Sequence, residues 1–233
     1  MSSRFSAALA GVRDIFPLAV GTTPFAIIFG TLAVAAGLSP LATIAMSCIV
    51  FAGSAQFISL GLIGSGAPLA VLWLTTFVVN LRHALYSATL QPVARNWSLP
   101  WRTLVAFWLT DESFAVVERR LQTMGEQAAL PYFIGAAVFF YFNWVAWTAV
   151  GALVGARLPG LAGLGLDFAM IATFAAMAAP QLRSATPLVV ALTAGATALL
   201  AHGLPYKLGL VLAALAGVTA GVVADRRRPE EPL

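Results

Sequence analysis

Two adjacent carboxylates in the middle of an apolar segment are the side chains of this sequence best suited to chemistry. They are Asp111 and Glu112, in the string TDESF. Neighbouring side chains on a helix point about 100° apart, so the two cannot face one partner. We expect one to face a cavity, where it exchanges protons or holds an ammonium group, and the other to pair with Arg82 or Arg119. The alternative is a helix at the membrane surface whose carboxylates are both in water.

A polar stripe in the string NLRHALYS is the second candidate. Asn80, His83 and Ser87 are spaced by three and four residues, which places them on one face of a helix. Arg82 and Tyr86 share the adjacent face. His83 changes its charge near neutral pH and could carry a proton. The alternative for Arg82 and Tyr86 is that their polar ends reach toward the interface, because the apolar segment is ending there.

Small and polar residues interrupt two apolar segments and form a third candidate site. One string is FAGSAQF, and the other is AAPQL. Proline removes a helical hydrogen bond, and in lipid the freed carbonyls must find other partners or line a wet cavity. We expect substrate contacts here rather than a mere kink. The predicted contacts in these two strings are Phe51, Gly53, Ser54, Ala55, Gln56 and Gln181.

Asn143, beside Trp144 and Trp147, is a further polar residue at membrane depth. It either binds substrate or donates a hydrogen bond to a neighbouring helix, which stabilises packing by about 0.6 kcal/mol. The predicted substrate contacts outside the interrupted segments are Asn80, Asp111, Glu112 and Asn143, and the predicted proton-coupling residues are Asp111, Glu112 and His83.

The composition requires that these residues be held in place by helices that lie in a membrane. The 233 residues are 60% hydrophobic and 9% charged, with a mean hydropathy of +0.90. Soluble domains have about 25% charged residues, so a water-soluble globule is excluded, and the hydrophobicity excludes a disordered chain. The net charge of +4 comes from scattered arginines, which is unlike a nucleic-acid-binding stripe. We therefore predict an all-α polytopic membrane protein that binds no nucleic acid.

Windows of about 20 apolar residues predict about eight membrane-spanning helices. They lie at about 15–36, 41–63, 68–90, 101–117, 131–154, 165–181, 186–202 and 205–224. The alternative is about seven, if the segment at 101–117 enters the membrane without crossing it. Lys and Arg are more numerous in the loops on the side of the N-terminus, which places both termini in the cytoplasm.

The chain is expected to form one transmembrane transporter domain over residues 1–233, with a possible internal repeat. The two halves are 15–117 and 131–224, and Gln56 and Gln181 stand at corresponding ends of the similar strings. Transporters often carry such repeats, with interrupted helices in corresponding positions. Two helices rich in small residues also match by composition alone, so that alternative stays open.

Signatures of enzymes, metal sites and cofactor sites are missing from the sequence. It contains no HExxH metal motif, no GxSxG nucleophile turn, no Walker A phosphate loop and no GxGxxG unit. A single cysteine, Cys48, excludes an internal disulfide and a cysteine metal cluster. We therefore predict a protein without metal, cofactor or catalytic residues that is not an enzyme.

The strings FAGSAQF, NLRHALYS and TDESFA, in this order, resemble the AzlC family, the large subunits of bacterial branched-chain amino acid exporters. The resemblance covers nearly the whole chain. It implies a permease of the inner membrane that exports leucine, isoleucine, valine and sometimes methionine. It also implies a small four-helix partner of the AzlD type and coupling to the proton gradient.

A zwitterion with an apolar side chain fits the candidate residues. Its carboxylate could meet backbone N–H groups near Gly53–Gln56, and its ammonium group Asp111 or Glu112. Its apolar tail could rest on Phe51, Phe57 or Trp108. Other interpretations are an uncoupled channel or permease for another small solute, a membrane enzyme with Asp111 and Glu112 as an acid–base pair, and a purely structural subunit. No motif supports the enzyme, and the polar stripe argues against the structural subunit.

Overall fold

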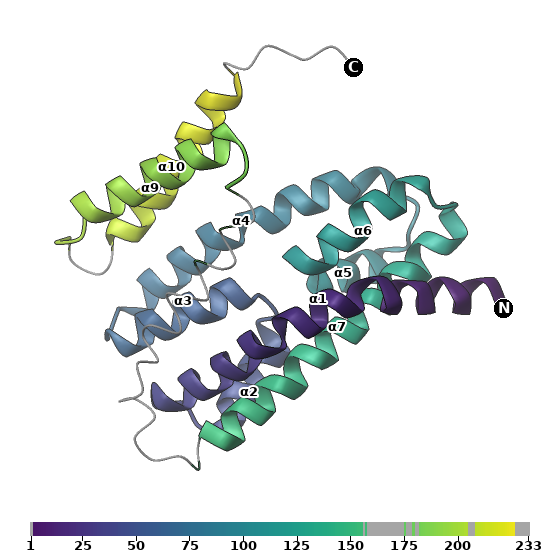
Figure 1. Ribbon diagram of the computed structural model, residues 1–233, viewed down its shortest axis with the longest axis horizontal. Coiled ribbons are helices and arrows are strands. Elements are labelled where there is room, and N and C mark those ends of the chain that lie inside the picture. The colour runs from purple at the N-terminus through teal and green to yellow at the C-terminus, as the bar shows by residue number, and fades with distance from the viewer. Residues whose placement is uncertain are drawn as a thin grey trace. The chain divides into compact units, whose positions relative to one another are not determined.

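Every regular element in the described part of the chain is a helix, which confirms the all-α prediction. The computed structural model describes residues 2–155, 157, 175, 179, 182–204 and 208–226. The helices, labelled in Figure 1, are α1 (Ser2–Ala35), α2 (Pro40–Ile49), α3 (Gly53–Gly64), α4 (Leu69–Ala94), α5 (Leu99–Trp108), α6 (Asp111–Thr123), α7 (Glu126–Gly155), α9 (Ala185–Leu200) and α10 (Leu208–Arg226).

Three of these helices are long and apolar enough to cross a membrane. The candidate spans are Arg4–Ala35, Leu69–Ala94 and Gln127–Gly155, of 32, 26 and 29 residues. About 20 residues suffice for a crossing, so the chain is a multi-pass membrane protein, as predicted. The sixth predicted segment lies almost wholly outside the described residues. The count of eight crossings, or seven, therefore stays a prediction.

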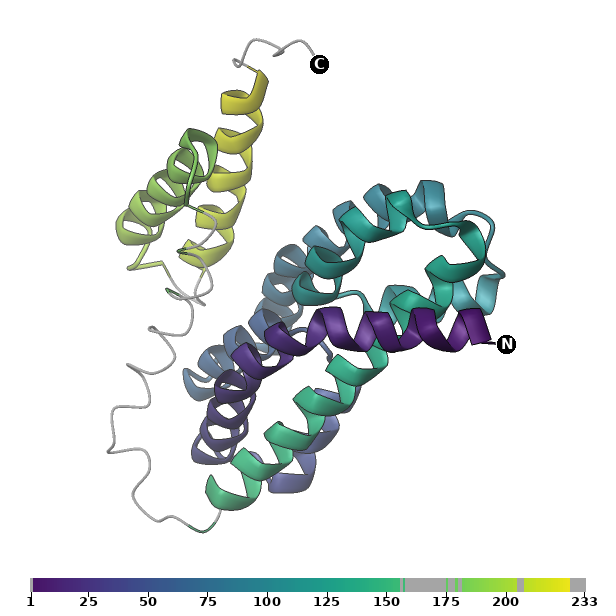
Figure 2. The same ribbon diagram turned by 45° about the vertical axis from the view of Figure 1, so that its right-hand side comes forward.

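The chain divides into two compact units. The first consists of Met1–Phe57 and Asn80–Leu166, and the second of Ile58–Val79 and Asp167–Leu233. In the second unit α9 and α10 form an antiparallel hairpin, drawn in green and yellow in Figure 2. A hydrogen bond from Thr186 Oγ1 to Asp225 Oδ1, of 2.9 Å, joins the start of α9 to the end of α10.

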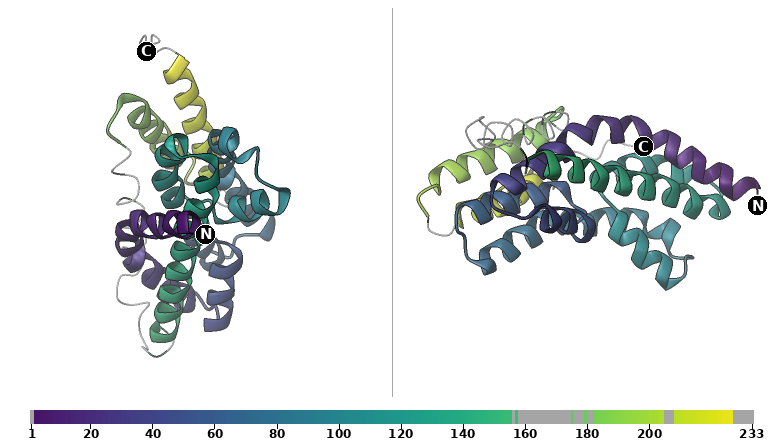
Figure 3. Two further views of the ribbon diagram at one scale, coloured as in Figure 1. Left: turned by 90° about the vertical axis from the view of Figure 1, so that its right-hand side faces the viewer. Right: turned by 90° about the horizontal axis from the view of Figure 1, so that it is seen from below.

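The first unit is built on close packing between α1 and α7, which lie side by side in Figure 3. The two helices run parallel, since Gly135 lies against Ala8 and Gly151 lies against Ile27. A Cβ atom at either glycine would overlap the facing backbone carbonyl. Small residues let helices approach this closely in lipid, where van der Waals packing drives association. The shorter helices α2, α5 and α6 pack against this pair.

Two predicted apolar segments are each split into a pair of short helices. Residues 50–52 separate α2 from α3, as the interruption at FAGSAQF predicted. Residues 109–110 separate α5 from α6, so the segment at 101–117 is not one helix with carboxylates near its middle. Asp111 is instead the first residue of α6.

A capping box explains where α6 begins. The Thr110 side chain accepts a hydrogen bond from the Ser113 backbone N–H at 3.3 Å, and Ser113 Oγ accepts one from the Thr110 N–H at 2.8 Å. These two bonds satisfy donors that a helix start otherwise leaves unpaired. The break therefore has a local cause in the sequence TDES, and it fixes Asp111 at a helix N-terminus.

Candidate functional site

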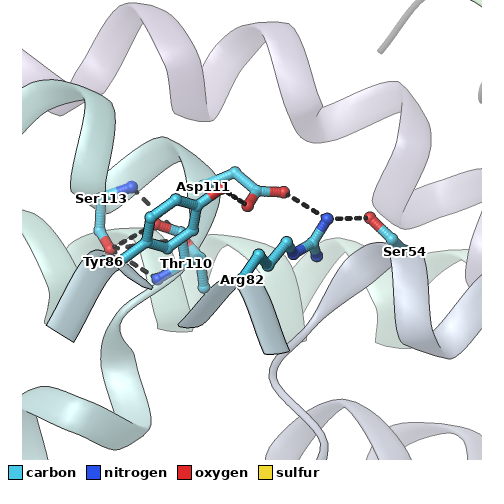
Figure 4. Close-up of polar contacts among 6 residues, drawn as sticks. All are labelled: Ser54, Arg82, Tyr86, Thr110, Asp111 and Ser113. Atoms are coloured by element: carbon cyan, nitrogen blue, oxygen red, sulfur yellow. Dashed lines mark hydrogen bonds and ion pairs between the residues drawn. The ribbon is translucent and has the colours of Figure 1, made fainter. Parts of the chain in front are cut away.

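An ion pair between Asp111 and Arg82 is the centre of the candidate site. Arg82 Nη1 lies 3.1 Å from Asp111 Oδ2, and the two side chains are 27% and 30% exposed. The Tyr86 hydroxyl donates a hydrogen bond to Asp111 Oδ1 at 2.7 Å. Arg82 Nη1 also donates to Ser54 Oγ at 3.1 Å. Figure 4 shows Arg82 lying between Ser54 and Asp111, so one guanidinium joins three helices.

The broken helices and α4 together position this ion pair. Arg82 and Tyr86 are four residues apart on α4, so both reach the same carboxylate. Ser54 is the second residue of α3, and Asp111 is the first of α6. The N-terminus of a helix carries partial positive charge, which stabilises Asp111 where it stands. The Tyr86 ring stacks on Phe114 with centroids 4.3 Å apart, which holds the phenol in place.

Buried polar atoms without partners occur on the same stretch of α4 and at the end of α5. Within the described part of the chain, the buried atoms Asn80 Oδ1, Arg82 Nε, His83 Nε2 and Trp108 Nε1 have no hydrogen-bond partner. A buried polar group left unpaired costs about 1–3 kcal/mol. Such atoms need an explanation in a native protein, and a bound water or ion is one such explanation. The ion pair is thus flanked by donors and acceptors available to a ligand.

Gln56 belongs to a separate polar network between α2, α3 and α7. Its Nε2 donates to Ser47 Oγ at 2.9 Å, and its Oε1 accepts from Trp144 Nε1 at 3.0 Å. Ser47 Oγ lies 3.0 Å from Thr148 Oγ1. Gln56 is fully buried, so both ends of its amide already serve helix packing. Its predicted contact with substrate stays a prediction, and it requires this network to open.

The other predicted residues lie at several places. Phe51 packs against the ring of Tyr141 with centroids 5.0 Å apart, and Gly53 lies against the Trp144 ring. Asn143 Nδ2 donates to the Ala19 carbonyl at 3.1 Å, which is the helix-to-helix hydrogen bond that is one of the two alternatives for this residue. Ala55 is fully buried in α3, and Glu112 follows Asp111 in the first turn of α6. Gln181 lies outside the described residues.

One charged cluster escaped the sequence prediction. The Tyr132 hydroxyl donates to Asp14 Oδ2 at 2.8 Å, and Arg120 Nε lies 3.6 Å from the same oxygen. The three residues come from α7, α1 and α6, so no spacing in the sequence places them together. The available signal is the carboxylate of Asp14 beside the first apolar segment. No group of three or more potential metal ligands occurs in the described residues.

The chain is similar to several known membrane proteins. It is 32% identical to the inner membrane protein YgaZ of Escherichia coli (strain K12), over 64% of this chain and 62% of that protein. It is also 32% identical to an uncharacterized membrane protein of Archaeoglobus fulgidus, over 89% of this chain and 90% of that protein. The branched-chain amino acid transport protein AzlC of Bacillus subtilis (strain 168) is 29% identical, over 71% of this chain and 65% of its own length. No solved structure matches the chain.

The family comparison covers the residues of the Asp111 site. The family model described as "AzlC protein" matches residues 17–158, which is well over half of the chain. This range contains both broken helices and the polar stretch of α4. The chain therefore belongs to the AzlC family.

Proposed function

We propose that this chain is a secondary transporter subunit that exports the branched-chain amino acids leucine, isoleucine and valine, and methionine in addition, with proton coupling. The observation that carries the proposal is the partly buried ion pair of Arg82 and Asp111 between the starts of two half-helices. The name of the Bacillus subtilis relative supports the substrate class. Discontinuous helices that meet at a charged site are a recurrent design of secondary transporters.

Recognition follows from exchange of ionic partners. An amino acid carries one ammonium and one carboxylate group, so it can enter between Asp111 and Arg82 and pair with each. The two protein charges exchange one partner for another, and neither is left unpaired in a poorly solvated site. The Arg82 guanidinium already reaches the first turn of α3, where backbone N–H groups and the helix dipole also favour a carboxylate. Phe114, stacked on Tyr86, offers an apolar surface for the substrate side chain.

Proton coupling can use the same carboxylate. Protonation of Asp111 removes the charge that holds Arg82 and the substrate ammonium group, so a proton and a substrate compete for one site. His83, with an unpartnered Nε2 on α4, is the second candidate for the proton, and Glu112 is the third. Replacement of His83 by Gln separates these roles, because loss of proton-driven transport with retained exchange assigns the proton to His83.

The cellular setting is part of the same proposal. We place the chain in the inner membrane of a bacterium with both termini in the cytoplasm, beside a small four-helix subunit of the AzlD type. We also retain the internal repeat with halves 15–117 and 131–224. The parallel packing of α1 and α7 supports this repeat, since they are the first helices of the two halves. If the halves are related by an axis along the membrane normal, their first helices must run in the same direction.

Counterflow of labelled leucine in proteoliposomes tests the proposal, with this chain alone and with a candidate small subunit. We expect uptake that unlabelled valine drives and unlabelled lysine does not. Asp111→Asn should abolish uptake, whereas the matched control Asp225→Asn, on α10, should retain it. Exchange by Asp111→Asn at the rate of the unchanged protein would refute the carboxylate mechanism. Leucine flux that a proton gradient cannot drive uphill would indicate an uncoupled channel instead.

A further inference from the structure

A cavity between α4 and α5 lies beside the site described above and has no role in it so far. Its volume is about 360 Å³, which is within the range of small-molecule sites. All of its walls belong to the first compact unit. The lining residues used below are Ser87, Gln91 and Arg95 on one side and Arg102 and Leu109 on the other.

The α4 wall of the cavity continues the polar stripe of that helix. Ser87, Gln91 and Arg95 follow one another at intervals of four residues, on the same face as Asn80 and His83. Arg95 continues the helical path, because its backbone N–H donates to the Gln91 carbonyl at 2.9 Å. Polar side chains along one face of a membrane helix are costly in lipid and mark solute pathways. The stripe extends over about 22 Å at the helical rise of about 1.5 Å per residue.

The two ends of the cavity differ in character. Ser87 and Leu109 at one end are the chain neighbours of Tyr86 and Thr110, so this end adjoins the Asp111 site. The other end is at the connection between α4 and α5, where Arg95 and Arg102 are both exposed. Neither arginine forms an ion pair with an acidic residue in the described ranges of the chain. Within those ranges, the guanidinium groups of Arg95 and Arg102 at this end of the cavity therefore have no carboxylate partner.

We propose that this cavity is the vestibule through which a carboxylate-bearing solute passes between the Asp111 site and one face of the membrane. Arg95 and Arg102 attract the carboxylate group, and the stripe of Ser87 and Gln91 solvates it on the way. This inference rests on the proposed transport function for the identity of the solute. An anionic lipid phosphate also suits two arginines, but it does not require polar residues along α4 toward the Asp111 site.

Thiol labelling tests the vestibule without measuring transport. Cys48 is first replaced by Ala, and single cysteines are then introduced by Ser87→Cys and Gln91→Cys in the full chain. Membrane-impermeant thiol reagents of negative and positive charge are compared in vesicles. The negative reagent should modify Gln91→Cys about tenfold faster than the positive one, since charged clefts concentrate opposite charges by this order. Arg95→Gln together with Arg102→Gln should abolish the preference.

Leu85→Cys is the matched control on the same helix. Leu85 is 70% exposed and lies about 200° around the helix from Ser87, on the side away from the stripe. It should face lipid and resist both reagents. Labelling of Leu85→Cys with no labelling at 87 and 91 overturns the vestibule, and so do equal rates of the two reagents at 91. These outcomes hold whether or not leucine is transported, so the vestibule and the proposed function fail separately.

Changes in lipid composition distinguish a solute from an anionic lipid as the ligand of the two arginines. The same labelling is performed in nanodiscs of phosphatidylcholine alone and with phosphatidylglycerol added. A vestibule for solute should show the same charge preference in both, and excess leucine should slow the modification of Gln91→Cys. Loss of the preference on addition of phosphatidylglycerol, with no protection by leucine, would assign the arginines to a lipid phosphate and contradict the proposal.

Discussion

The first compact unit contains two clusters of the same composition, each with one aspartate, one arginine and one tyrosine. In both, the tyrosine hydroxyl donates to the carboxylate, at 2.7 Å in one and 2.8 Å in the other. The ion pairs differ, with arginine-to-aspartate distances of 3.1 and 3.6 Å and arginine side chains 27% and 54% exposed. The Asp111 cluster consists of Asp111, Arg82 and Tyr86, and the Asp14 cluster consists of Asp14, Arg120 and Tyr132.

The difference between the clusters lies in their surroundings. Around Arg82, buried polar atoms on α4 lack partners, whereas none of the unpartnered atoms in the described residues belongs to the Asp14 cluster. Helix α6 contributes to both, with Asp111 in its first turn and Arg120 in its last. We propose that the Asp14 cluster fixes the far end of α6 to α1 and α7, and that the Asp111 cluster is the one that exchanges partners.

The largest expected effect is on the transport rate, which should depend on Asp111 far more than on Asp14. Asp111→Asn should lower the rate of leucine counterflow by about 100-fold or more, because loss of one member of a hydrogen-bonded charge pair typically costs 2–5 kcal/mol. Asp14→Asn removes the matching charge from the other cluster and should change the rate less than about threefold, since exposed ion pairs contribute about 0–1 kcal/mol. Equal losses in the two variants would show that both clusters serve the same function.

The residues of the Asp111 cluster could be predicted from the sequence, because the signals that mark them are local. Arg82 and Tyr86 are one helical turn apart, and Asp111 stood out as a charge in an apolar run. The break at FAGSAQF was predicted from its small residues. The break at 109–110 was not, because hydrophobicity continues to Leu109 and the capping signal is a Thr-x-x-Ser rather than the stronger Thr-x-x-Glu.

The Asp14 cluster could not be predicted from the sequence, because its residues meet only through the register in which the helices pack. Tyr132 reaches Asp14 only when α1 and α7 lie parallel in the register that their glycine contacts set. Nothing in the spacing of 118 residues between them indicates this. The same limit applies to the partners of Gln56, because its hydrogen bonds to Ser47 and Trp144 depend on how three helices pack. Its predicted contact with substrate stays a prediction.

Removal of the two tyrosine hydroxyls gives the next largest difference. Tyr86→Phe keeps the stacking on Phe114 and removes one donor to Asp111, so counterflow should fall about tenfold, as for a hydrogen bond to a charged group. Tyr132→Phe should leave the rate unchanged and lower the melting temperature in detergent, because Tyr132 is fully buried between helices. The reverse pattern, with Tyr132→Phe inactive and Tyr86→Phe active, would exchange the roles of the clusters.

Loss of a helix cap tests whether the start of α6 positions Asp111. Thr110→Val removes the capping box and should destabilise the protein by about 1 kcal/mol while it also lowers counterflow. Ser39→Ala is the matched control, since Ser39 Oγ caps α2 by accepting from the Ala42 N–H at 3.1 Å. It should cost a similar stability and leave counterflow intact. Normal counterflow in Thr110→Val would mean that Asp111 needs no fixed helix start.

The smallest expected effect concerns the stability supplied by the Asp14 cluster. Arg120→Gln removes an ion pair whose arginine is 54% exposed, so the unfolding free energy should change by no more than about 1 kcal/mol. The corresponding change, Arg82→Gln, leaves Asp111 without its cation in a less exposed place and should destabilise more. Melting temperatures at low and high salt distinguish the pairs, because salt screens an exposed pair more strongly than a sheltered one. A greater loss of stability from Arg120→Gln than from Arg82→Gln would show that the anchor at the far end of α6, rather than the exchangeable pair, holds the broken helix in place.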